Sequence, residues 1–414
     1  MATLRVLLII TDNEKNDGSI LQDKFLEFEK RENIEIKTTF VSWNRAYENI
    51  IMAFKEGNAP DVLQIGTTWL RTIAHLGYLS KTPDIKVRKP LTKWIENCCF
   101  YQGKRIGVPW LTDAVAIAAR QDIMKKLDIT KEDIRDWSGF YNICKYIKEK
   151  RINNRTIPQP LAFTLRPEMG SFHRFSSWLF AQGDSYPSIN PLPDKFLSKD
   201  SVIKVFEYLP RLLKACNLGI SDIDKHPYQL DDDFYENGSY VFFIRNWNGM
   251  INDLFNPPGK GNNKHLYTVL PIPIKDPEKG NGAFGGGSVL SVSSNTNYPD
   301  KAWNLVEYMI SDEFTNQWIK LTGEVPAYEA DFWRKRFSDP RIDTMYKIIV
   351  NSQTYPLHPA WPTLEELLHQ GISSCLWRII EDSSNLSIEN IIQLLKKTDR
   401  DIINILKICW GVEQ

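Results

Sequence analysis

The sequence has no excess of charge of either sign. Its 414 residues include 51 Lys and Arg and 51 Asp and Glu, which gives a formal net charge of +0 at pH 7. A protein that binds nucleic acid needs clustered cations to neutralise phosphates, and an anionic membrane surface attracts proteins in the same way. The balanced charge therefore argues against a nucleic-acid partner and against attachment to an acidic membrane.

Long apolar runs are also missing. The sequence contains no apolar window of about eighteen residues, so it predicts no transmembrane helix. The first apolar stretch, LRVLLII at 4–10, is short and has neither a basic segment before it nor a small-residue cleavage site after it. We interpret it as a strand and not as a signal peptide. Two alternatives follow: an extracellular or periplasmic protein whose export signal is absent from this sequence, or a cytoplasmic protein.

The six cysteines do not follow a metal-ligand pattern. They include no C-x-x-C pair and have no His at ligand spacing, so a structural zinc site lacks support and we expect neither a metal nor another cofactor. Buried free thiols are the expected state, although the adjacent Cys98 and Cys99 leave a redox role open. The cysteines are Cys98, Cys99, Cys144, Cys216, Cys375 and Cys409.

Catalytic motifs are absent as well. The sequence has no P-loop, no H-E-x-x-H and no G-x-S-x-G. The segment GNGAFG at 280–285 matches G-x-G-x-x-G by letter, but it follows a polar turn and leads into a strand, whereas a dinucleotide site needs glycines that open a helix. We therefore expect a protein that is not an enzyme, with a glycan-degrading enzyme as the alternative.

What the sequence does contain is the composition of a folded protein with two domains or lobes. Hydrophobic residues make up 42% and charged residues 25%, and 414 residues are too many for one ordinary core. In the first third, apolar strand patterns at 4–10, 34–40 and 61–65 alternate with amphipathic helical patterns. Strands separated by helices predict a parallel, doubly wound sheet with its ligand at the carboxyl ends of the strands.

Polar loops follow two of these strands. Asp12-Asn13-Glu14-Lys15 comes after the first strand, and Gly66-Thr67-Thr68-Trp69 comes after the third. Their side chains are suited to hydrogen bonding with a ligand. The alternative is that both segments are solvated loops that cap the next helix.

An aromatic and an acid stand out in the middle of a stretch that otherwise has the pattern of a buried strand. Trp110-Leu-Thr-Asp113 follows a polar turn and precedes a run of small apolar residues. Further along, the segments 173–183 and 240–247 are rich in aromatics, Pro299 begins a helical pattern, and the last segment is helical. The predicted apolar face of that last helix consists of Ile388, Ile391, Ile392, Leu395, Ile402, Leu406 and Cys409.

Eight segments follow one another over nearly the whole chain: LQDKFLEFEKRENIEIKTTFVSW, FKEGNAPDVLQIGTTWLRTIAHLGYL, GKRIGVPWLTDAVAIAARQDIMKKL, SSWLFAQGD, DDDFYENGSYVFFIRNWN, YTVLPIP, GGGSVLSVSSNTNYPDKAWNLVEYMIS and GEVPAYEADF. In this order they resemble the extracellular solute-binding proteins of ABC importers, in the sugar-binding branch that includes the maltodextrin-binding proteins. No single segment is diagnostic, but the ordered set is specific.

The resemblance implies an α/β protein with the two-lobed, type II fold of periplasmic binding proteins. Each lobe is a sheet flanked by helices, and a multi-crossover hinge joins the lobes. Lobe 1 would comprise 1–112 plus 289–325 and lobe 2 would comprise 113–288 plus 326–414, with the ligand cleft between them.

In such a fold the strand at 106–119 would be a crossover whose midpoint lies at the floor of the cleft. This placement would make Trp110 and Asp113 cleft residues on an otherwise buried strand. A second crossing is expected near 288–293 and a third near 323–326.

The resemblance also suggests which residues hold the ligand. Asp113 would accept hydrogen bonds from neighbouring hydroxyls, and flat aromatics would stack on the apolar faces of sugar rings. Trp178 and Trp303 are expected in the core, and no residue is expected to be catalytic. The candidate ligand-binding residues are Asp12, Asn13, Glu14, Trp43, Thr67, Thr68, Trp69, Trp110, Asp113, His173, Arg245, Trp247, Gly286 and Trp361.

The implied function is reversible binding of a carbohydrate, of oligosaccharide size, by a monomer whose hinge closes on the ligand and which delivers it to an ABC permease. The alternative is a ligand-sensing module that reports to a signalling partner and binds a sugar or a small cationic metabolite. This alternative is motivated by the acidic first loop, by the six cysteines and by the absence of an export signal and a lipid-attachment cysteine from the sequence as given.

Overall fold

The computed structural model describes residues 2–10, 21–154, 156–166, 168–246, 267–275, 282–336, 339–381 and 387–411. Four candidate ligand-binding residues lie outside these ranges, and so does the stretch at 276–281, which includes the first two residues of GNGAFG. The four are Asp12, Asn13, Glu14 and Trp247.

Strands and helices alternate along the first part of the chain, as the apolar patterns predict. In order they are β1 (Ala2–Ile10), α1 (Gln22–Glu32), β2 (Ile34–Ser42), α2 (Trp43–Lys55), β3 (Val62–Gly66), α3 (Leu70–His75), α4 (Lys93–Cys98), β4 (Phe100–Tyr101), β5 (Lys104–Arg105), β6 (Val108–Arg120), α5 (Gln121–Lys126), η2 (Glu132–Ile134), α6 (Trp137–Asn153) and β7 (Gln159–Ala162).

The remainder of the described chain is mainly helical. The elements are α7 (Met169–Phe180), α8 (Asp200–Cys216), α9 (Ile220–Ile223), α10 (Pro227–Asp231), η3 (Asp232–Glu236), β8 (Tyr240–Asn246), β9 (Tyr267–Leu270), β10 (Gly285–Val292), α12 (Pro299–Met309), α13 (Asp312–Thr322), β11 (Val325–Pro326), α14 (Asp331–Arg336), α15 (Pro340–Asn351), α16 (Trp361–Glu381) and α17 (Ile388–Trp410).

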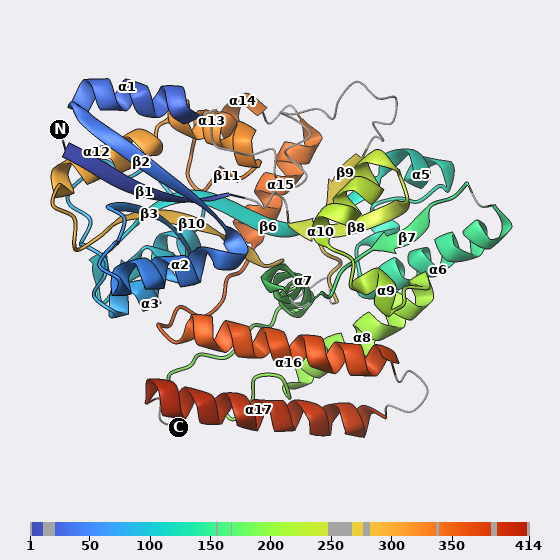
Figure 1. Ribbon diagram of the computed structural model, residues 1–414. Helices are drawn as coiled ribbons and strands as arrows, with labels where there is room; N and C mark the ends of the chain where they lie inside the picture. The colour runs from blue at the N-terminus through green and yellow to red at the C-terminus, as the bar shows by residue number, and fades with distance from the viewer. Residues whose placement is uncertain are drawn as a thin grey trace.

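Nine of the described strands form one long sheet in the order β2-β1-β3-β10-β6-β8-β7, with β9 and β11 also paired to β6, and β4 and β5 form a separate two-stranded sheet. β1 is parallel to β2 and β3, whereas β10 is antiparallel to both β3 and β6. Figure 1 shows that the strands gather in two groups and that β6 runs from the β1–β3 group to the β7–β8 group. This arrangement is the mixed α/β, two-lobed fold that the resemblance implies.

Helices cover both faces of the first group of strands because the side chains of β1 alternate between two cores. Leu4 and Leu8 pack in the same cluster as Phe28 of α1. Leu7 and Ile9 pack in a second cluster that includes the buried face of α2. A strand that buries both faces needs a helix on each side, which is the doubly wound arrangement that the alternation of strands and helices predicts.

β6 changes partners halfway along its length. Its first part, up to Ala114, pairs with β10 on one side, and Leu111 and Thr112 pair with β11 on the other. From Val115 onward it pairs instead with β8, and from Ile117 also with β9. The predicted crossover strand is therefore confirmed. Asp113 lies one residue before Ala114, which is the last residue of β6 that pairs with β10.

A close approach of two backbones marks the junction between β10 and β6. Gly287 has φ of +146°, and a Cβ at this position would lie 2.1 Å from the carbonyl oxygen of Leu111. Two positions later the register shifts by one residue, which leaves Trp110 without a partner on β10. Its carbonyl instead accepts a hydrogen bond from the N–H of Ala327 at 3.0 Å. A bulge of this kind bends the strand and turns a side chain in a new direction.

The C-terminal helices α16 and α17 form an antiparallel pair below α7 (Figure 1). Leu395 and Leu406 of α17 are buried as the predicted face requires, but Ile388 and Cys409 at its two ends are exposed. The apolar face is therefore shorter than predicted, although the last turn still contacts α16, where Nε1 of Trp410 donates a 3.2 Å hydrogen bond to the hydroxyl of Thr363. Near its end, the ring of Trp410 lies 5.9 Å from that of His75 on α3.

Two further findings concern the described residues as a set. None of their helices combines the length and the apolar character that a membrane crossing requires. Among the same residues, His, Cys, Asp and Glu nowhere gather in a group of three or more that could hold a metal ion.

Candidate functional site

Three residues form a row across the strands that join the two halves. Gly286 of β10 is the register partner of Asp113 of β6. On the other side of β6, Val325 pairs with Thr112, so the residue before it, Glu324, lies next to Asp113. Residues directly opposite each other on adjacent strands have neighbouring side chains on the same face. The row therefore places two carboxyl groups side by side, next to a position that has no side chain.

Asp113 is half-buried and connects the two groups of strands. Its Oδ2 accepts a hydrogen bond of 3.1 Å from Nδ2 of Asn246 at the end of β8. Its Oδ1 accepts a second one, of 2.7 Å, from the N–H of Ala114. A carboxylate has several acceptor positions, and these contacts fix the orientation of the group.

Glu324 is much more buried, with 6% of the residue exposed. The indole Nε1 of Trp318 on α13 donates a hydrogen bond of 3.1 Å to its Oε2. Burial raises the pKa of the Glu324 carboxyl to about 8; hydrogen bonds from Trp318 and Trp43 oppose the shift, and the nearby Asp113 carboxylate adds to it. Glu324 is therefore largely protonated at neutral pH, whereas an ordinary glutamate is ionised.

An aromatic cluster lies at the carboxyl ends of β2 and β3. The ring of Trp69 lies 5.7 Å from that of Trp43 and 5.7 Å from that of Tyr47. Trp69 folds back over Gly66, where a Cβ would meet its ring at 3.0 Å. Trp43 and Tyr47 are half-buried, so parts of their rings are accessible. Because Trp43 also hydrogen-bonds to Glu324, the cluster extends to the row of carboxyl groups.

The loop after β3 is held against β10. The N–H of Thr67 donates a 3.0 Å hydrogen bond to the carbonyl of Gly287, and the N–H of Trp69 donates one of 2.9 Å to the carbonyl of Gly66. Thr67 is buried and Thr68 is half-buried. Of the two threonines, Thr68 is thus the one with an accessible side chain.

Two tryptophans that were expected in the cleft lie in the core. Trp110 is 0% exposed and packs against Trp318 at 4.5 Å. Trp361 is 1% exposed and stacks on Tyr355 at 4.9 Å. Neither ring offers an open face to a ligand, because each is covered by another aromatic side chain. Trp178 and Trp303 are buried, as expected.

His173 projects from α7 into a group of polar and aromatic side chains in the second half. Its ring stacks on Phe284 at 4.0 Å, and its Nε2 lies 3.3 Å from Oε1 of the buried Glu365 on α16. One helical turn further along α16, burial lowers the pKa of His369. Phe284 directly precedes β10, and its ring occupies the space beside Gly286. His173 is therefore connected to the row through Phe284.

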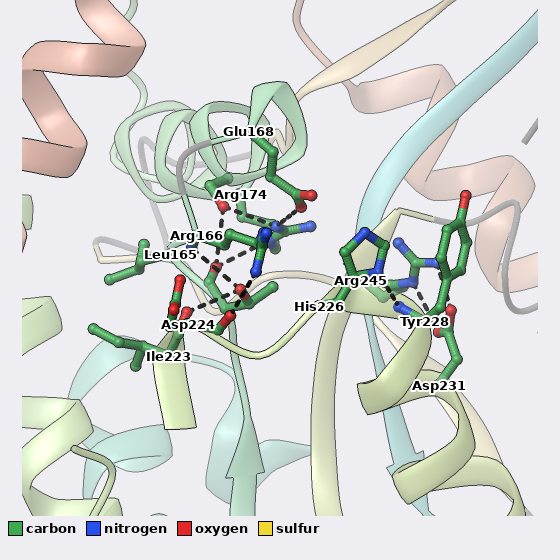
Figure 2. A network of polar contacts seen from close by, with 12 residues as sticks. Leu165, Arg166, Glu168, Arg174, Ile223, Asp224, His226, Tyr228, Asp231 and Arg245 are labelled. Atoms are coloured by element: carbon green, nitrogen blue, oxygen red, sulfur yellow. Dashed lines mark hydrogen bonds and ion pairs between the residues drawn. The ribbon is translucent and has the colours of Figure 1, made fainter. Parts of the chain in front are cut away.

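Arg245 is engaged by an acid that the sequence did not reveal. Its Nε and Nη2 donate hydrogen bonds of 2.8 Å and 2.6 Å to the two carboxylate oxygens of Asp231. Figure 2 shows this pair beside Tyr228, with a second pair formed by Arg174 and Glu168 on and before α7. Because the bidentate ion pair with Asp231 satisfies both charges, Arg245 has a structural role in this structure, next to Asn246 on β8.

The structure thus brings together part of the predicted set. Trp43, Trp69, Asp113 and Gly286 are close to one another, and His173 is linked to them through Phe284. Sequence reasoning missed Glu324, Asn246 and Tyr47. Asn246 could have been found as the neighbour of Arg245 in an aromatic segment, whereas Glu324 carries no signal in the sequence beyond its place in the third predicted crossing.

The comparisons with known proteins agree with this fold. A family model of bacterial extracellular solute-binding proteins matches residues 25–330. The diacetylchitobiose binding protein DasA of Streptomyces coelicolor is 25% identical over 345 residues, which are 82% of this chain and 77% of that protein.

Two solved structures have the same architecture. Maltose-bound MalE3 of T. maritima has a TM-score of 0.78 and 16% sequence identity, and the match covers 97% of this chain and 100% of that one. The sugar-binding protein MalE from Xanthomonas citri has a TM-score of 0.76 and 18% identity, with both chains covered to 100%. Since the family model spans well over half of the sequence, the chain belongs to the bacterial extracellular solute-binding proteins, a family of binding proteins and not of enzymes.

Proposed function

We propose that the protein binds a neutral carbohydrate at the junction of its two lobes and presents it to the permease of an ABC importer. The observation that carries this proposal is the arrangement of the Asp113 carboxylate, fixed by Asn246, next to the half-buried rings of Trp43 and Tyr47. A sugar has a rim of hydroxyls and an apolar C–H face, and this combination of a fixed acceptor with flat aromatics matches both.

The names of the relatives support the same class of ligand. DasA is described as a diacetylchitobiose binding protein, and the T. maritima structure is of a maltose-bound protein. Another similar fold, at a TM-score of 0.75 and 17% identity, is the GacH receptor of Streptomyces glaucescens in complex with acarbose. These ligands share several hydroxyls on pyranose-sized rings, which is the chemistry that the Asp113 region can recognise.

We further propose that binding closes a hinge in the three strands that cross the junction. Lobe 1 would comprise 1–112 plus 289–325, and lobe 2 would comprise 113–288 plus 326–414. A ligand that contacts both lobes only when they are closed shifts the equilibrium toward closure, and the permease recognises that shape. In this proposal the protein acts as an exported monomer, outside the cytoplasm, and does not bind nucleic acid.

A thermal-shift and calorimetry panel tests the proposal. Diacetylchitobiose, maltose and acarbose are the neutral or amino-sugar oligosaccharides, and choline is the cationic control. A ligand that binds only the folded protein raises the midpoint of unfolding, and the shift grows with the logarithm of the ligand concentration once that exceeds Kd. We expect one of the sugars to raise the midpoint and choline to leave it unchanged. A shift with choline and none with any sugar would contradict the proposal.

A further inference from the structure

The strands at the junction place two acids next to each other where ordinary sheets avoid such a pair. Asp113 on β6 and Glu324, the residue just before β11, lie side by side, as the pairing of Thr112 with Val325 requires. Like charges directly opposite each other destabilise a sheet, so two ionised carboxylates here would repel each other at short range. Gly286 on the far side of Asp113 contributes no side chain that could separate or neutralise them.

The groups that face Glu324 come from several elements. The Trp318 indole on α13 donates to its carboxyl, the Trp43 indole on α2 also hydrogen-bonds to it, and the charged neighbour on β6 is Asp113. On its own segment, the Thr322 hydroxyl accepts a hydrogen bond from the N–H of Glu324. The Thr322 side chain also forms a hydrogen bond that opposes the rise in the Glu324 pKa, so the surroundings named here are neutral N–H and O–H groups and one further acid, and Glu324 is buried among them with 6% exposure.

Such a pair favours a state with one proton on it. A carboxyl group that is buried beside a second carboxylate keeps its proton well above the usual pH, because ionisation would place a second negative charge in a poorly hydrated site. In the protonated state the pair offers both an O–H donor and a carboxylate acceptor. A polyol needs both partners, because each hydroxyl donates one hydrogen bond and can accept others.

We propose that Glu324 keeps a proton because it is buried beside the Asp113 carboxylate, and that this proton makes ligand binding depend on pH. With the proton present, the pair is suited to a neutral polyol; without it, the pair is a dianion that a neutral ligand cannot compensate. A ligand that covers the row removes further water from it, so binding strengthens the hold on the proton. Affinity then falls as the pH rises past the point where Glu324 ionises. This inference rests on the proposed function for the identity of the ligand, but the proton itself can be measured without any ligand.

The first experiment therefore uses the protein alone. The indole N–H resonance of Trp43, assigned by its loss in Trp43→Phe, reports on Glu324 through their hydrogen bond. It is followed by NMR from about pH 6 to about pH 10 in the wild type, in Glu324→Gln and in Glu329→Gln, an exposed acid paired with Lys89 five residues further on. We expect a titration with a midpoint near pH 8 in the wild type and in Glu329→Gln, and no titration in Glu324→Gln.

A resonance that does not titrate, or that titrates equally in Glu324→Gln, overturns the inference. Should Glu324→Gln not fold, Asp113→Asn decides the question. Loss of the neighbouring negative charge lowers the midpoint if the Asp113 carboxylate helps Glu324 to keep its proton, and an unchanged midpoint overturns the inference.

The second experiment measures the coupling to ligand by calorimetry with diacetylchitobiose near pH 7 and near pH 9. We expect Kd to rise severalfold, by up to about tenfold per pH unit above the midpoint, in the wild type and in Glu329→Gln, and to stay constant in Glu324→Gln. Binding that is equally tight at both pH values overturns the coupling while the proposed function stands. If no sugar of the panel binds but the indole titrates, the proposed function fails and the proton on Glu324 is supported.

Discussion

The carboxylate of Asp399 accepts a 2.6 Å hydrogen bond from the hydroxyl of Ser198, a residue that lies 201 positions earlier in the sequence. The same carboxylate also accepts the backbone N–H groups of Phe196, Leu197 and Ser198 at 2.7 Å to 3.1 Å. Asp399 is buried on α17. One side chain thus satisfies three consecutive backbone donors ahead of α8 and joins the last helix to the second half.

Replacement of Asp399 by Ala should therefore be costly. The change leaves three buried N–H groups without an acceptor, and each such group costs on the order of 1 kcal/mol or more. We expect the free energy of unfolding to fall by about 3 kcal/mol, measured by urea denaturation. Asp401→Ala, at an exposed position on the same helix, is the control and should change it by less than about 0.5 kcal/mol. Equal effects of the two changes would mean that the Asp399 contacts contribute little.

The close approach of β10 to β6 makes a second prediction. Gly287→Ala would place a Cβ 2.1 Å from the carbonyl oxygen of Leu111, at a φ that L-residues rarely adopt. We expect a loss of about 3 kcal/mol or more in the free energy of unfolding, because one of the backbones must move. Gly57→Ala is the matched control: its φ is +72° and no atom lies within 4 Å, so only the backbone cost of about 1 kcal/mol remains.

Glu324 should also make stability depend on pH. Its pKa is about 8 in the folded protein and 4.5 for the ordinary group. Between these values the folded state holds a proton that the unfolded chain has released. The free energy of unfolding therefore falls as the pH rises through this window, by up to about 1.4 kcal/mol per pH unit.

Glu324→Gln cannot ionise and should lack this contribution. The stability of the variant relative to the wild type should rise from pH 5 to pH 8 and then stay level, as measured by urea denaturation at each pH. Glu329→Gln, in an exposed ion pair with Lys89, should show no comparable change in the same window. A constant difference between Glu324→Gln and the wild type would contradict the assignment of the raised pKa.

The cysteines give a prediction for thiol chemistry. Cys409 is exposed, whereas Cys98, Cys99, Cys144, Cys216 and Cys375 are buried. Burial raises the pKa of Cys98 to about 12 and raises that of Cys99 as well, so neither has the thiolate character that a redox pair needs. We expect Ellman's reagent to modify one thiol in the native protein and none in Cys409→Ser. Rapid reaction of a second thiol in the folded protein would reopen a redox role for Cys98 and Cys99.

The aromatic cluster makes a prediction for binding. Trp69→Ala removes the ring that supports Trp43 and Tyr47, and we expect affinity for the sugar identified in the panel to fall by about 2 kcal/mol in calorimetry. A similar loss is expected for Trp247→Ala, which lies outside the described residues. Tyr298→Ala, at an exposed position at the start of α12, should leave affinity unchanged. Unaltered binding in Trp69→Ala would place the ligand elsewhere.

The part of the fold that the sequence predicted is the part that depends on local patterns of apolar residues. The strand pattern at 34–40 and the amphipathic helical patterns of the first third are properties of neighbouring residues, so they could be recognised without a structure. The crossover and its second and third passages came from the resemblance. The apolar face of α17 was extended too far at Ile388 and Cys409, which are exposed, because the spacing along one helix does not show which of its turns other elements cover.

The site was harder to predict because its chemistry depends on partners that are distant in the sequence. Trp110 and Trp361 were placed in the cleft on their size and position, but Trp318 and Tyr355 cover them. Arg245 was assigned to the ligand, but Asp231 occupies its guanidinium. Glu324 was missed because its neighbour Asp113 lies on another strand, and no spacing along the chain shows that two acids become adjacent.

β6 imposes a constraint on how this protein can change over evolution. Its thirteen residues are one uninterrupted strand that supplies rungs to both groups of partners, with an irregularity near Trp110. Loss or gain of a single residue between Asp113 and Val115 would change the register of β6 with β8 relative to its register with β10. Inward-facing and outward-facing side chains would then be exchanged in one group of strands and unchanged in the other. Insertions and deletions should therefore accumulate in the loops of either half, while the length of this one segment is inherited as a unit.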